Sequence, residues 1–574
     1  MNAAPTSASA SAARSRNTLT AAALFLATAA FTLWQNTRVA VLWDLSYLLD
    51  SSYRISLGQL PYRDFPFAHA PLTFLLHAAI IRILGRVYLP HTVIAALEAG
   101  AATVLTWRIL LNLLQPFANR TWAIATLLAA PLTVLGIYAI YPHPIYDSDC
   151  ILAVLLAVYL LQRSAESQAR NFLAGAACIL PLFCKQNIGL LFLAAVLVSV
   201  ATIATLRRLQ RVGIAPQLWL FAGAATALAA ALLAIHATAG LHNYLYWTVT
   251  FAVQRRLPGL GLILSTYRQT SLLWTLPAAI AALILLHQHS LGAPSRSQSH
   301  RDLGGMRYRL IAVLLLASPF LWTIASLALS SDPSDRADQL LSLWPHILIL
   351  SAALALYNLR RPPTLYTLLP IILLATIHGV FLSQQLWGST YAIWPLLSLL
   401  IALLLTQVPT IARPLATIIA ATFLLCGGLY ATSHERLSYI RLDGPESHAT
   451  LPEFRGLTTP GPWIPDFEEL VRFTNTEIPF DDGILLIPGE DPFYFTTGRT
   501  PQFPIQLFDP AIDPYTPQQT LEEARAHNIR WLIVNRNLQL TGPPHPNLPE
   551  IIRVVQQDFI PYRTLTNYDI YRRK

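Results

Sequence analysis

The chain has few charged residues and almost no lysine. Only 12% of its 574 residues are Asp, Glu, Lys or Arg, whereas about 25% are charged in a typical soluble domain. Lysine occurs only at Lys185 and Lys574, and 54% of the chain is hydrophobic. This excludes an ordinary soluble protein. Apolar runs of about 18 or more residues, the length needed to cross a bilayer, recur along most of the chain. The sequence therefore predicts a polytopic α-helical membrane protein.

Cysteine is also scarce. The four cysteines, Cys150, Cys178, Cys184 and Cys426, all lie in or beside apolar segments. None lies after residue 432, so that region has no disulfide framework. Their spacing is not that of a metal site, and we interpret them as small buried apolar residues. The C-terminal region also lacks a glycine-rich dinucleotide fingerprint and a P-loop.

Apolar length and arginine positions together predict the topology. We expect about thirteen transmembrane helices, at 18–36, 88–110, 121–141, 148–163, 171–184, 187–206, 216–239, 271–288, 309–330, 342–358, 363–382, 391–408 and 413–432. The apolar segment from Pro71 to Gly85 is too short to span and carries His77 and Arg82, so we expect an amphipathic helix in the interface. With that choice, the arginine clusters fall on the same side as Arg14 and Arg16. The positive-inside rule then places the N-terminus in the cytoplasm and the C-terminal region outside.

Charge divides the chain into two parts. Residues 1–432 hold 26 basic and 11 acidic residues, a net charge of +15, and residues 433–574 hold 13 and 19, a net charge of −6. The basic excess indicates membrane topology and contact with anionic lipid, and not nucleic acid. We therefore predict a transmembrane domain over 1–432 and an extracytoplasmic α/β domain over 433–574. Buried strands are expected at 483–488 and 531–535, a helix at 518–527, and further strand near 562–572.

Acidic residues in the predicted outer segments are candidates for catalysis. A polar, aromatic segment expected to be a loop, Trp43 to Pro71, carries Asp44, and a second outer loop carries Asp147 and Asp149. A carboxylate within hydrogen-bond reach of a hydroxyl can act as a general base when that hydroxyl attacks a sugar carbon. The alternative is helix capping, because Asp44 and Asp147 both precede apolar helical runs.

Four residues are candidates for binding a phosphate. Lys185 and Gln186 lie at a turn between two apolar segments, and lysine is a compact charge suited to phosphate. Arg255 and Arg256 fall on the predicted outer side, against the positive-inside pattern. The alternatives are a snorkelling interfacial lysine and lipid head-group binding by the arginines. Tyr62, Asp64, His69 and His143 are expected to support the site; for the two histidines an ordinary interfacial role stays open.

Several short motifs resemble a known family. The motifs are Trp43-Asp44 with Tyr47, the run from Gly58 to Asp64, Pro71-Leu72-Thr73, the loop from Pro142 to Asp149, the stretch from Gly175 to Gln186, and the stretch from Pro488 to Arg499. Together they resemble the outer loops, the glycine-rich span ending in Lys, and the outer α/β domain of membrane glycosyltransferases with the GT-C fold. The bacterial branch akin to protein O-mannosyltransferases and the lipid A aminoarabinose transferase is most similar.

The resemblance implies a function. It implies inverting transfer of a sugar from a polyprenyl-phosphate donor to a hydroxyl of a glycan, lipid or protein acceptor, on the outer face of the inner membrane. Asp44 would be the base, and Asp147 or Asp149 would support it. The resemblance implies no certain cofactor. A divalent metal stays open as an alternative, because Asp147-Ser148-Asp149 resembles a metal-binding DxD motif, but it is not favoured, because many relatives have an acidic residue directly after the first Asp, where this chain has Leu45.

Two other classes of function remain open from the sequence. A lipid-linked sugar transporter would share the many spans, but it would be expected to show broken helices in paired halves, and no such internal repeat is visible. A non-catalytic membrane scaffold or subunit would use the C-terminal region to bind a partner. That interpretation predicts that Asp44 and Lys185 are dispensable.

Overall fold

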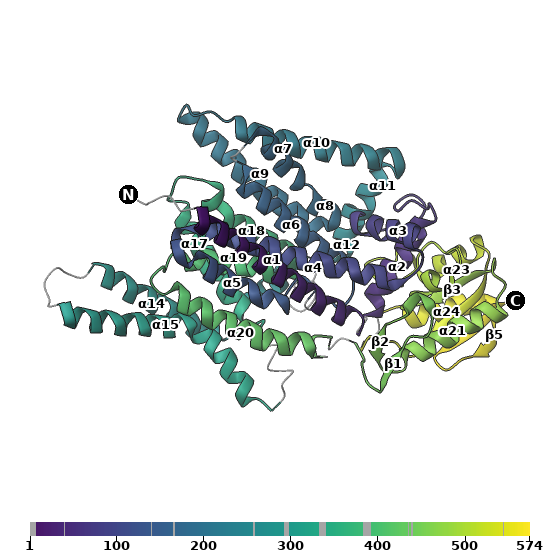
Figure 1. The fold of residues 1–574 in the computed structure, drawn as a ribbon. Helices are drawn as coiled ribbons and strands as arrows, with labels where there is room; N and C mark the ends of the chain where they lie inside the picture. The colour runs from purple at the N-terminus through teal and green to yellow at the C-terminus, as the bar shows by residue number, and fades with distance from the viewer. Residues whose placement is uncertain are drawn as a thin grey trace.

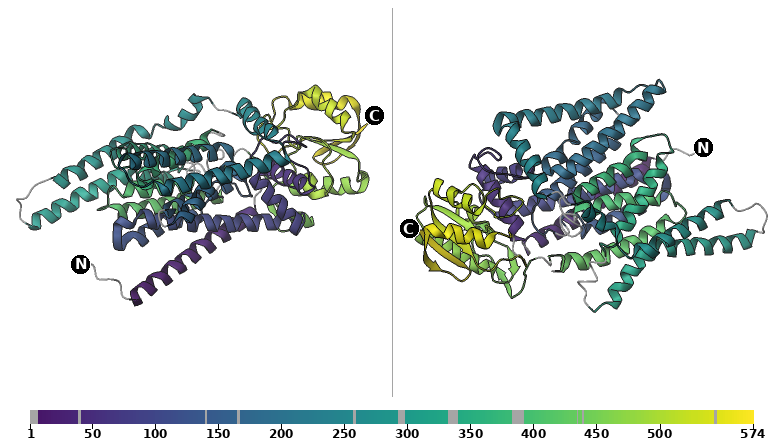
Figure 2. Two further views of the ribbon diagram at one scale, coloured as in Figure 1. Left: turned by 90° about the horizontal axis from the view of Figure 1, so that it is seen from above. Right: turned by 180° about the vertical axis from the view of Figure 1, so that it is seen from behind.

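The structure is a computed structural model that describes most of the chain. The described residues are 7–38, 41–138, 141–164, 167–256, 259–291, 298–331, 340–382, 392–433, 435–437, 440–542 and 545–574. They form a long helical bundle with a sheet-bearing domain attached at one end (Figures 1 and 2). We call this end of the bundle the domain end.

The bundle is built from apolar helices. Its helices are α1 (Ser7–Asn36), α4 (Tyr88–Leu113), α5 (Thr121–Ala129) with η2 (Ala130–Thr133), α6 (Tyr146–Gln162), α7 (Gln168–Ala177), α8 (Leu180–Cys184), α9 (Gln186–Leu209), α10 (Ala215–Thr238), α14 (Leu272–Leu291), α15 (Gln298–Leu329), α17 (Leu343–Asn358), α18 (Leu365–Phe381), α19 (Trp394–Leu405) and α20 (Ala412–Thr432). Each predicted span corresponds to one of these helices or to a consecutive pair.

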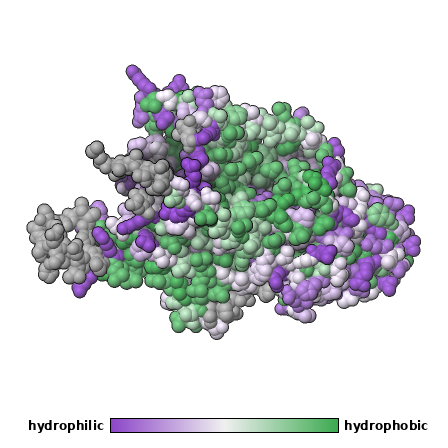
Figure 3. Space-filling model, viewed as in Figure 1, coloured by the Kyte–Doolittle hydropathy of each residue, from purple (hydrophilic) through white to green (hydrophobic). Residues whose placement is uncertain are grey.

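Six helical stretches are long and apolar enough to cross a membrane among the residues that the structure describes. They are Ser11–Asn36, Tyr88–Leu113, Gln186–Leu209, Ala215–Thr238, Arg307–Leu329 and Ala412–Thr432. The other predicted spans are shorter apolar or broken helices, so a polytopic helical membrane protein is confirmed while the number thirteen stays a prediction. Figure 3 shows an apolar surface over the bundle, with hydrophilic residues gathered on the sheet-bearing domain and at the opposite end.

Two predicted spans differ from a single straight helix. The helix predicted over 121–141 ends at Thr133, just after Pro131, and the chain continues in turns to Tyr138. The segment predicted at 171–184 is divided into α7 and α8, and Pro181 stands in the first turn of α8. Both breaks deliver side chains to the domain end, as the site below shows.

Helices α7 and α10 approach each other closely through two glycines. A Cβ on Gly175 would lie 2.0 Å from the carbonyl oxygen of Leu220, and one on Gly223 would lie 1.9 Å from the carbonyl oxygen of Phe172. Small residues at such a crossing let helix backbones meet, which is a common way to join helices in a membrane. The glycines therefore hold α10 against α7 at a spacing that no larger residue permits.

The prediction that Trp43 to Pro71 is a loop is wrong for its first half. Residues Leu42–Ser56 form helix α2, which is almost entirely buried. Leu42, Leu45, Leu49 and Tyr53 recur at helical spacing and pack into a core with residues of the C-terminal domain. The polar residues between them obscured this stripe, and its partners lie some 400 residues further along the chain.

The segment after α2 stays at the domain end. Helix α3 (Leu72–Leu84) matches the predicted interfacial helix, and it exposes Leu72, Leu75, Leu76 and Ile83. The Tyr88 hydroxyl at the start of α4 donates to the Asn36 carbonyl at the end of α1, 3.3 Å away. Helices α2 and α3 therefore lie between two spans whose ends meet, and they do not carry the chain across the bundle.

The C-terminal domain contains a four-stranded mixed sheet in the order β3-β4-β6-β5. Its elements are β1 (Glu446–His448), β2 (Thr458–Pro460), α21 (Trp463–Glu477), β3 (Gly483–Ile487), α22 (Phe493–Thr497), α23 (Pro517–Ala526), β4 (Ile529–Asn535), α24 (Leu548–Val555), β5 (Phe559–Thr564) and β6 (Tyr568–Arg573). The predicted strands and the predicted helix at 518–527 are confirmed. Strand β3 is parallel to β4, and the other pairs are antiparallel.

Each face of the sheet has its own core. Ile484 and Leu486 face a cluster that includes α21, α22 and the apolar stripe of α2, whereas Leu485 and Ile487 face a cluster with α23 and α24. This alternation follows from the two-residue period of a strand. One face of the C-terminal domain is therefore completed by a helix from the N-terminal part of the chain.

Candidate active site

A buried ion pair lies at the domain end of the bundle. Lys185 Nζ donates to Asp147 Oδ1, and the two residues are 6% and 1% exposed. Lys185 is extended and links the end of α8 to the start of α9, while Asp147 lies in the first turn of α6. The Lys185 ammonium also lies 5.0 Å from the ring centre of Tyr146. The N-cap residue of α6 is Ile145, so Asp147 is not the capping residue that the sequence allowed.

Asp149 belongs to a second, separate group of polar side chains. Its carboxylate accepts a hydrogen bond from the Thr73 hydroxyl at 2.6 Å and lies 3.3 Å from the Tyr138 hydroxyl, whose single proton it shares with Glu98. The same Tyr138 hydroxyl lies 3.0 Å from a carboxylate oxygen of Glu98. The group joins α3, α4 and α6, and it leaves Asp147 as the acid that faces Lys185. Among the described residues, no three His, Cys, Asp or Glu side chains come together as a metal-ligating group.

An aromatic layer connects α2 to the ion pair. His69 Nδ1 lies 3.1 Å from the Tyr47 hydroxyl, and the His69 and Tyr146 rings are 4.7 Å apart at their centres. The Tyr62 hydroxyl donates to the His69 carbonyl at 2.7 Å, which holds the loop in place. His69 therefore stands between Tyr47 of α2 and Tyr146, which lies against Lys185.

Asp44 is half-buried in the first turn of α2. It precedes Tyr47 by three residues, so the two side chains share one side of the helix. The N-cap residue is Val41, without a side-chain cap, so Asp44 does not cap this helix. The C-terminal domain holds the same turn: the Trp43 indole donates to Asp509 at 3.1 Å, and the Ser46 hydroxyl donates to the Gly489 carbonyl at 3.0 Å.

Gln186 joins the ion pair to two neighbouring segments. Its side-chain amide donates to the Ala68 carbonyl at 2.8 Å and to the Thr248 carbonyl at 3.4 Å. Thr248 belongs to the segment of short helices α11 (Leu241–Leu245), η4 (Tyr246–Phe251) and α12 (Ala252–Arg256). The predicted pair Lys185–Gln186 is thus built into the wall between α9 and the loop that carries His69.

The two predicted arginines occupy a different position. The Arg255 guanidinium is exposed and lies 5.3 Å from the ring centre of Phe251. Its charge acts on the C-terminal domain: burial raises the pKa of Asp513 to about 7, and Arg255 opposes that rise. The side chain of Arg256 lies outside the described residues. Arg255 is therefore near the C-terminal domain, and no contact joins it to Lys185 in the described part of the chain.

Asp64 and His143 have local partners. Asp64 pairs with Arg63 at 2.7 Å and accepts the Leu60 amide at 2.7 Å, and the Arg63 hydrogen bond lowers the pKa of Asp64. His143 is buried, and its Nδ1 lies 2.9 Å from the Pro144 carbonyl; burial lowers the pKa of His143 to about 4. These contacts stabilise turns on either side of the site.

The sequence analysis missed three residues of the site, Glu98, Tyr138 and Thr73. Glu98 is the single acidic residue in the predicted span 88–110, and an acidic residue at membrane depth is rare and often functional. That signal would have found it. Thr73 was noted only as part of the Pro71-Leu72-Thr73 motif, and nothing in the sequence marks Tyr138, because the roles of both residues depend on a helix break and on how α3 packs.

Comparison with known proteins gives similarity in overall structure alone. No protein-family model and no curated protein sequence matches the chain. The chain is similar to a crystal structure of ArnT from Cupriavidus metallidurans bound to undecaprenyl phosphate, at 12% identity and a TM-score of 0.42, over 96% of this chain and 97% of that one. It is also similar to the Archaeoglobus fulgidus oligosaccharyltransferase tethered to an acceptor peptide, at 11% identity and a TM-score of 0.40, over 96% and 74%.

Both structures are of enzymes with the GT-C fold, the fold of the family that the sequence motifs resemble. Both TM-scores lie below 0.5, so the chemistry of this chain is argued from its own side chains.

Proposed function

We propose that the chain is a membrane glycosyltransferase that moves a sugar from a polyprenyl-phosphate donor to an acceptor hydroxyl, on the outer face of the inner membrane. The observation that carries the proposal is the buried Lys185–Asp147 pair, which lies beside the aromatic layer at the domain end. A buried charge is costly unless it is paired, and an ionisable residue among apolar helices marks a functional site.

Lys185 is the proposed donor-phosphate ligand. Its ammonium is a compact charge with three donors, and Asp147 uses one of them. The remaining donors suit the oxygens of a lipid phosphate. Asp147 holds the ammonium in place. Gln186 fixes the start of α9 through its bonds to the Ala68 and Thr248 carbonyls, which limits how far Lys185 moves.

Asp44 is the proposed general base. It stands on the same side of α2 as Tyr47, and Tyr47 contacts His69 in the layer next to Tyr146 and Lys185. This arrangement suits an acceptor hydroxyl bound from the C-terminal domain and a donor phosphate bound from the bundle. A base must lie within hydrogen-bond reach of the proton that it removes, and the half-buried position of Asp44 permits an acceptor to approach.

The proposed reaction is a single displacement. The acceptor oxygen forms a bond to the anomeric carbon while its proton passes to Asp44. The bond from that carbon to the phosphate oxygen breaks, and its electron pair stays on the phosphate. The lipid phosphate leaves with the added negative charge, which Lys185 stabilises as it develops. Attack opposite to the leaving group inverts the anomeric centre.

The test is sugar transfer in membranes that contain the full-length protein. Radiolabelled polyprenyl-phosphate sugars are offered as donors, and the label is followed into glycan, lipid or protein fractions. Asp44→Asn should lower turnover by about 10²–10⁴-fold, the contribution of a positioned general base. Donor binding should change far less, because the side-chain shape is retained.

The matched control is Asp443→Asn, the same substitution at an exposed position of the C-terminal domain, which should transfer at the wild-type rate. A stably inserted Asp44→Asn variant with full activity would remove Asp44 as the base. If no tested donor is transferred and the protein retains its cellular role without Lys185, the scaffold interpretation replaces the glycosyltransferase interpretation.

A further inference from the structure

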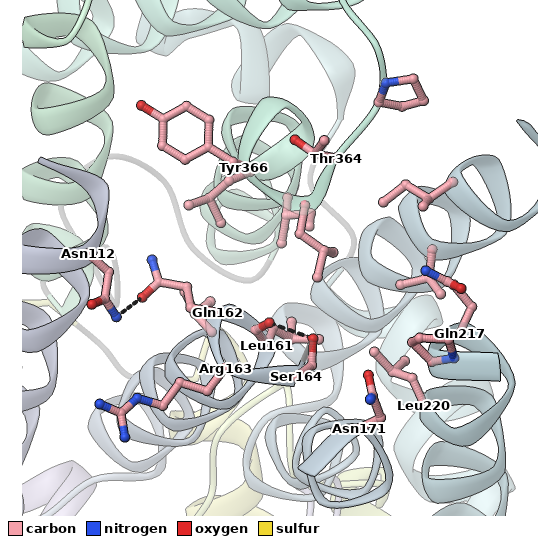
Figure 4. A pocket seen from close by; sticks show the side chains of 18 of the residues that line it. Asn112, Leu161, Gln162, Arg163, Ser164, Asn171, Gln217, Leu220, Thr364 and Tyr366 are labelled. Carbon is pink, nitrogen blue, oxygen red and sulfur yellow. Dashed lines mark hydrogen bonds between the residues drawn. The ribbon is translucent and has the colours of Figure 1, made fainter. Parts of the chain in front are cut away.

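A large cavity lies at the end of the bundle opposite to the candidate active site. Its volume is about 780 Å³, and it is lined by residues of α4, α6, α7, α9, α10 and α18 (Figure 4). Arg207 lines it near the end of α9, whereas Lys185 precedes the start of that helix. The 22 residues from Gln186 to Arg207 rise about 1.5 Å each, so about 30 Å separates the cavity from the ion pair. This is the thickness of a bilayer core.

The lining combines an apolar wall with a basic rim. Leucine, isoleucine and valine side chains of α4, α6, α9, α10 and α18 form the apolar part of the wall. Arg163 and Arg207 are exposed and stand at the rim. No Asp or Glu belongs to the lining in the part of the chain that the structure describes, and neither guanidinium is in an ion pair there. Two arginines that form no ion pair with another described residue thus border the cavity.

Polar side chains inside the cavity are partly satisfied by one another. Asn112 donates to Gln162 at 2.9 Å, and the Ser164 hydroxyl donates to the Leu161 carbonyl at 2.8 Å (Figure 4). Gln217 Oε1 differs, because it is buried and accepts no hydrogen bond from the described residues. A buried acceptor without a donor is unfavourable, so a ligand hydroxyl at this place would be stabilised.

We propose that this cavity binds a phosphate-bearing lipid from the inner leaflet, with the phosphate between Arg163 and Arg207 and the hydrocarbon against the apolar wall. An apolar pocket of about 300–1,000 Å³ with a few polar groups is typical of a ligand site. Arginine binds phosphate oxygens through its planar fork of donors. The positive-inside rule puts this end at the cytoplasmic face, where anionic lipids gather.

The shared chemistry, a phosphate on a hydrocarbon chain, has two sources in such a membrane. One is a bulk anionic phospholipid, and the other is a polyprenyl phosphate. The test is native mass spectrometry of the delipidated full-length protein titrated with phosphatidylglycerol, with undecaprenyl phosphate, or with phosphatidylcholine, which carries no net charge. The polyprenyl titration uses the Asp147→Asn/Lys185→Gln background, so that the proposed donor site does not contribute.

Arg163→Gln/Arg207→Gln should weaken binding of the anionic lipid by about 30-fold, because each arginine near an anionic lipid contributes roughly fivefold. Arg163→Lys/Arg207→Lys should retain most of the lipid binding, since this variant keeps both positive charges. The control is Arg208→Gln, which removes a charge from the next residue of α9, outside the lining, and should change binding by less than about twofold.

The outcomes separate the alternatives. Arginine-dependent binding of phosphatidylglycerol alone identifies a bulk-lipid site, and arginine-dependent binding of undecaprenyl phosphate alone identifies a site for the donor's carrier. Equal loss in the Arg163/Arg207 and Arg208 variants, or equal binding of phosphatidylcholine, overturns the proposal. None of these results depends on sugar transfer, so failure of the proposed enzyme function would remain distinguishable.

Discussion

The Lys185–Asp147 pair permits a test that separates stability from catalysis. Both residues are nearly inaccessible, with exposures of 6% and 1%. Lys185→Gln would leave the Asp147 carboxylate buried without its cation, and Asp147→Asn would leave the ammonium with the Tyr146 ring. Removing one partner of a buried pair destabilises by about 3–5 kcal/mol, whereas replacing both by neutral groups costs much less. The double variant should therefore be more stable than either single variant.

Transfer activity should follow a different order. The double variant recovers stability but has no cation for the donor phosphate. A hydrogen bond to a charged group is worth about 1.5–3 kcal/mol, so loss of the ammonium should lower kcat/KM by about 10–150-fold. Asp147→Asn retains the ammonium, so any correctly folded fraction should keep more activity than the double variant does.

The measurements are thermal denaturation of the purified protein and transfer kinetics in the same detergent. Lys574→Gln is the control, because it makes the same substitution at the one other lysine, which is exposed. A coupling of about 3 kcal/mol between the two sites is expected. Additive effects on stability would show that the pair does not act as a unit, and full transfer by the double variant would refute the phosphate role of Lys185.

Three further results are expected. A cysteine in place of Arg86 should be labelled from the outer face, because Arg86 donates to the Phe495 carbonyl of the C-terminal domain at 2.7 Å. A cysteine in place of Arg120 should be labelled from the cytoplasm, and labelling of both from one side would contradict the predicted topology. Burial raises the pKa of Asp50 to about 8. The contribution of this side chain to folding stability is therefore complete below about pH 4 and is lost as the pH rises through 8. Between pH 6 and pH 9, the melting temperature should fall further for the wild type than for Asp50→Asn. Equal falls in the two proteins would show that Asp50 does not cause the pH dependence of stability. Glu98→Leu should lower stability by about 1–2 kcal/mol by removing an acceptor of a buried hydroxyl, and Glu98→Gln should not; identical denaturation curves of the two variants would exclude a hydrogen-bonding role.

The membrane helices could be predicted from the sequence because their signal is local. A run such as 187–206 is apolar throughout, and its length alone indicates a helix, which the structure extends to Gln186–Leu209. The strands predicted at 483–488 and 531–535 were similarly visible as short apolar runs, and the structure has them at Gly483–Ile487 and Ile529–Asn535. In each case the residues that determine the element lie within it.

Helix α2 and the inner contacts of the site could not be predicted, because they depend on residues far away in the chain. Leu45 and Leu49 are buried by a domain that begins some 400 residues later. Lys185 and Asp147 were expected on one side of the membrane, but their pairing depends on where α8 ends and α6 begins. Charge and length predict the side of the membrane, whereas packing determines the partner.

The shared core of α2 has a consequence for any attempt to divide the protein. The helix presents Leu42, Leu45 and Leu49 to the C-terminal domain and carries Asp44 on the same turn. Because α2 packs into the C-terminal domain, a tilt of that domain must also move the proposed base. An acceptor that tilts the C-terminal domain when it binds would therefore change the distance between Asp44 and the sugar. Removal of residues 433–574 would leave this apolar stripe without its cover.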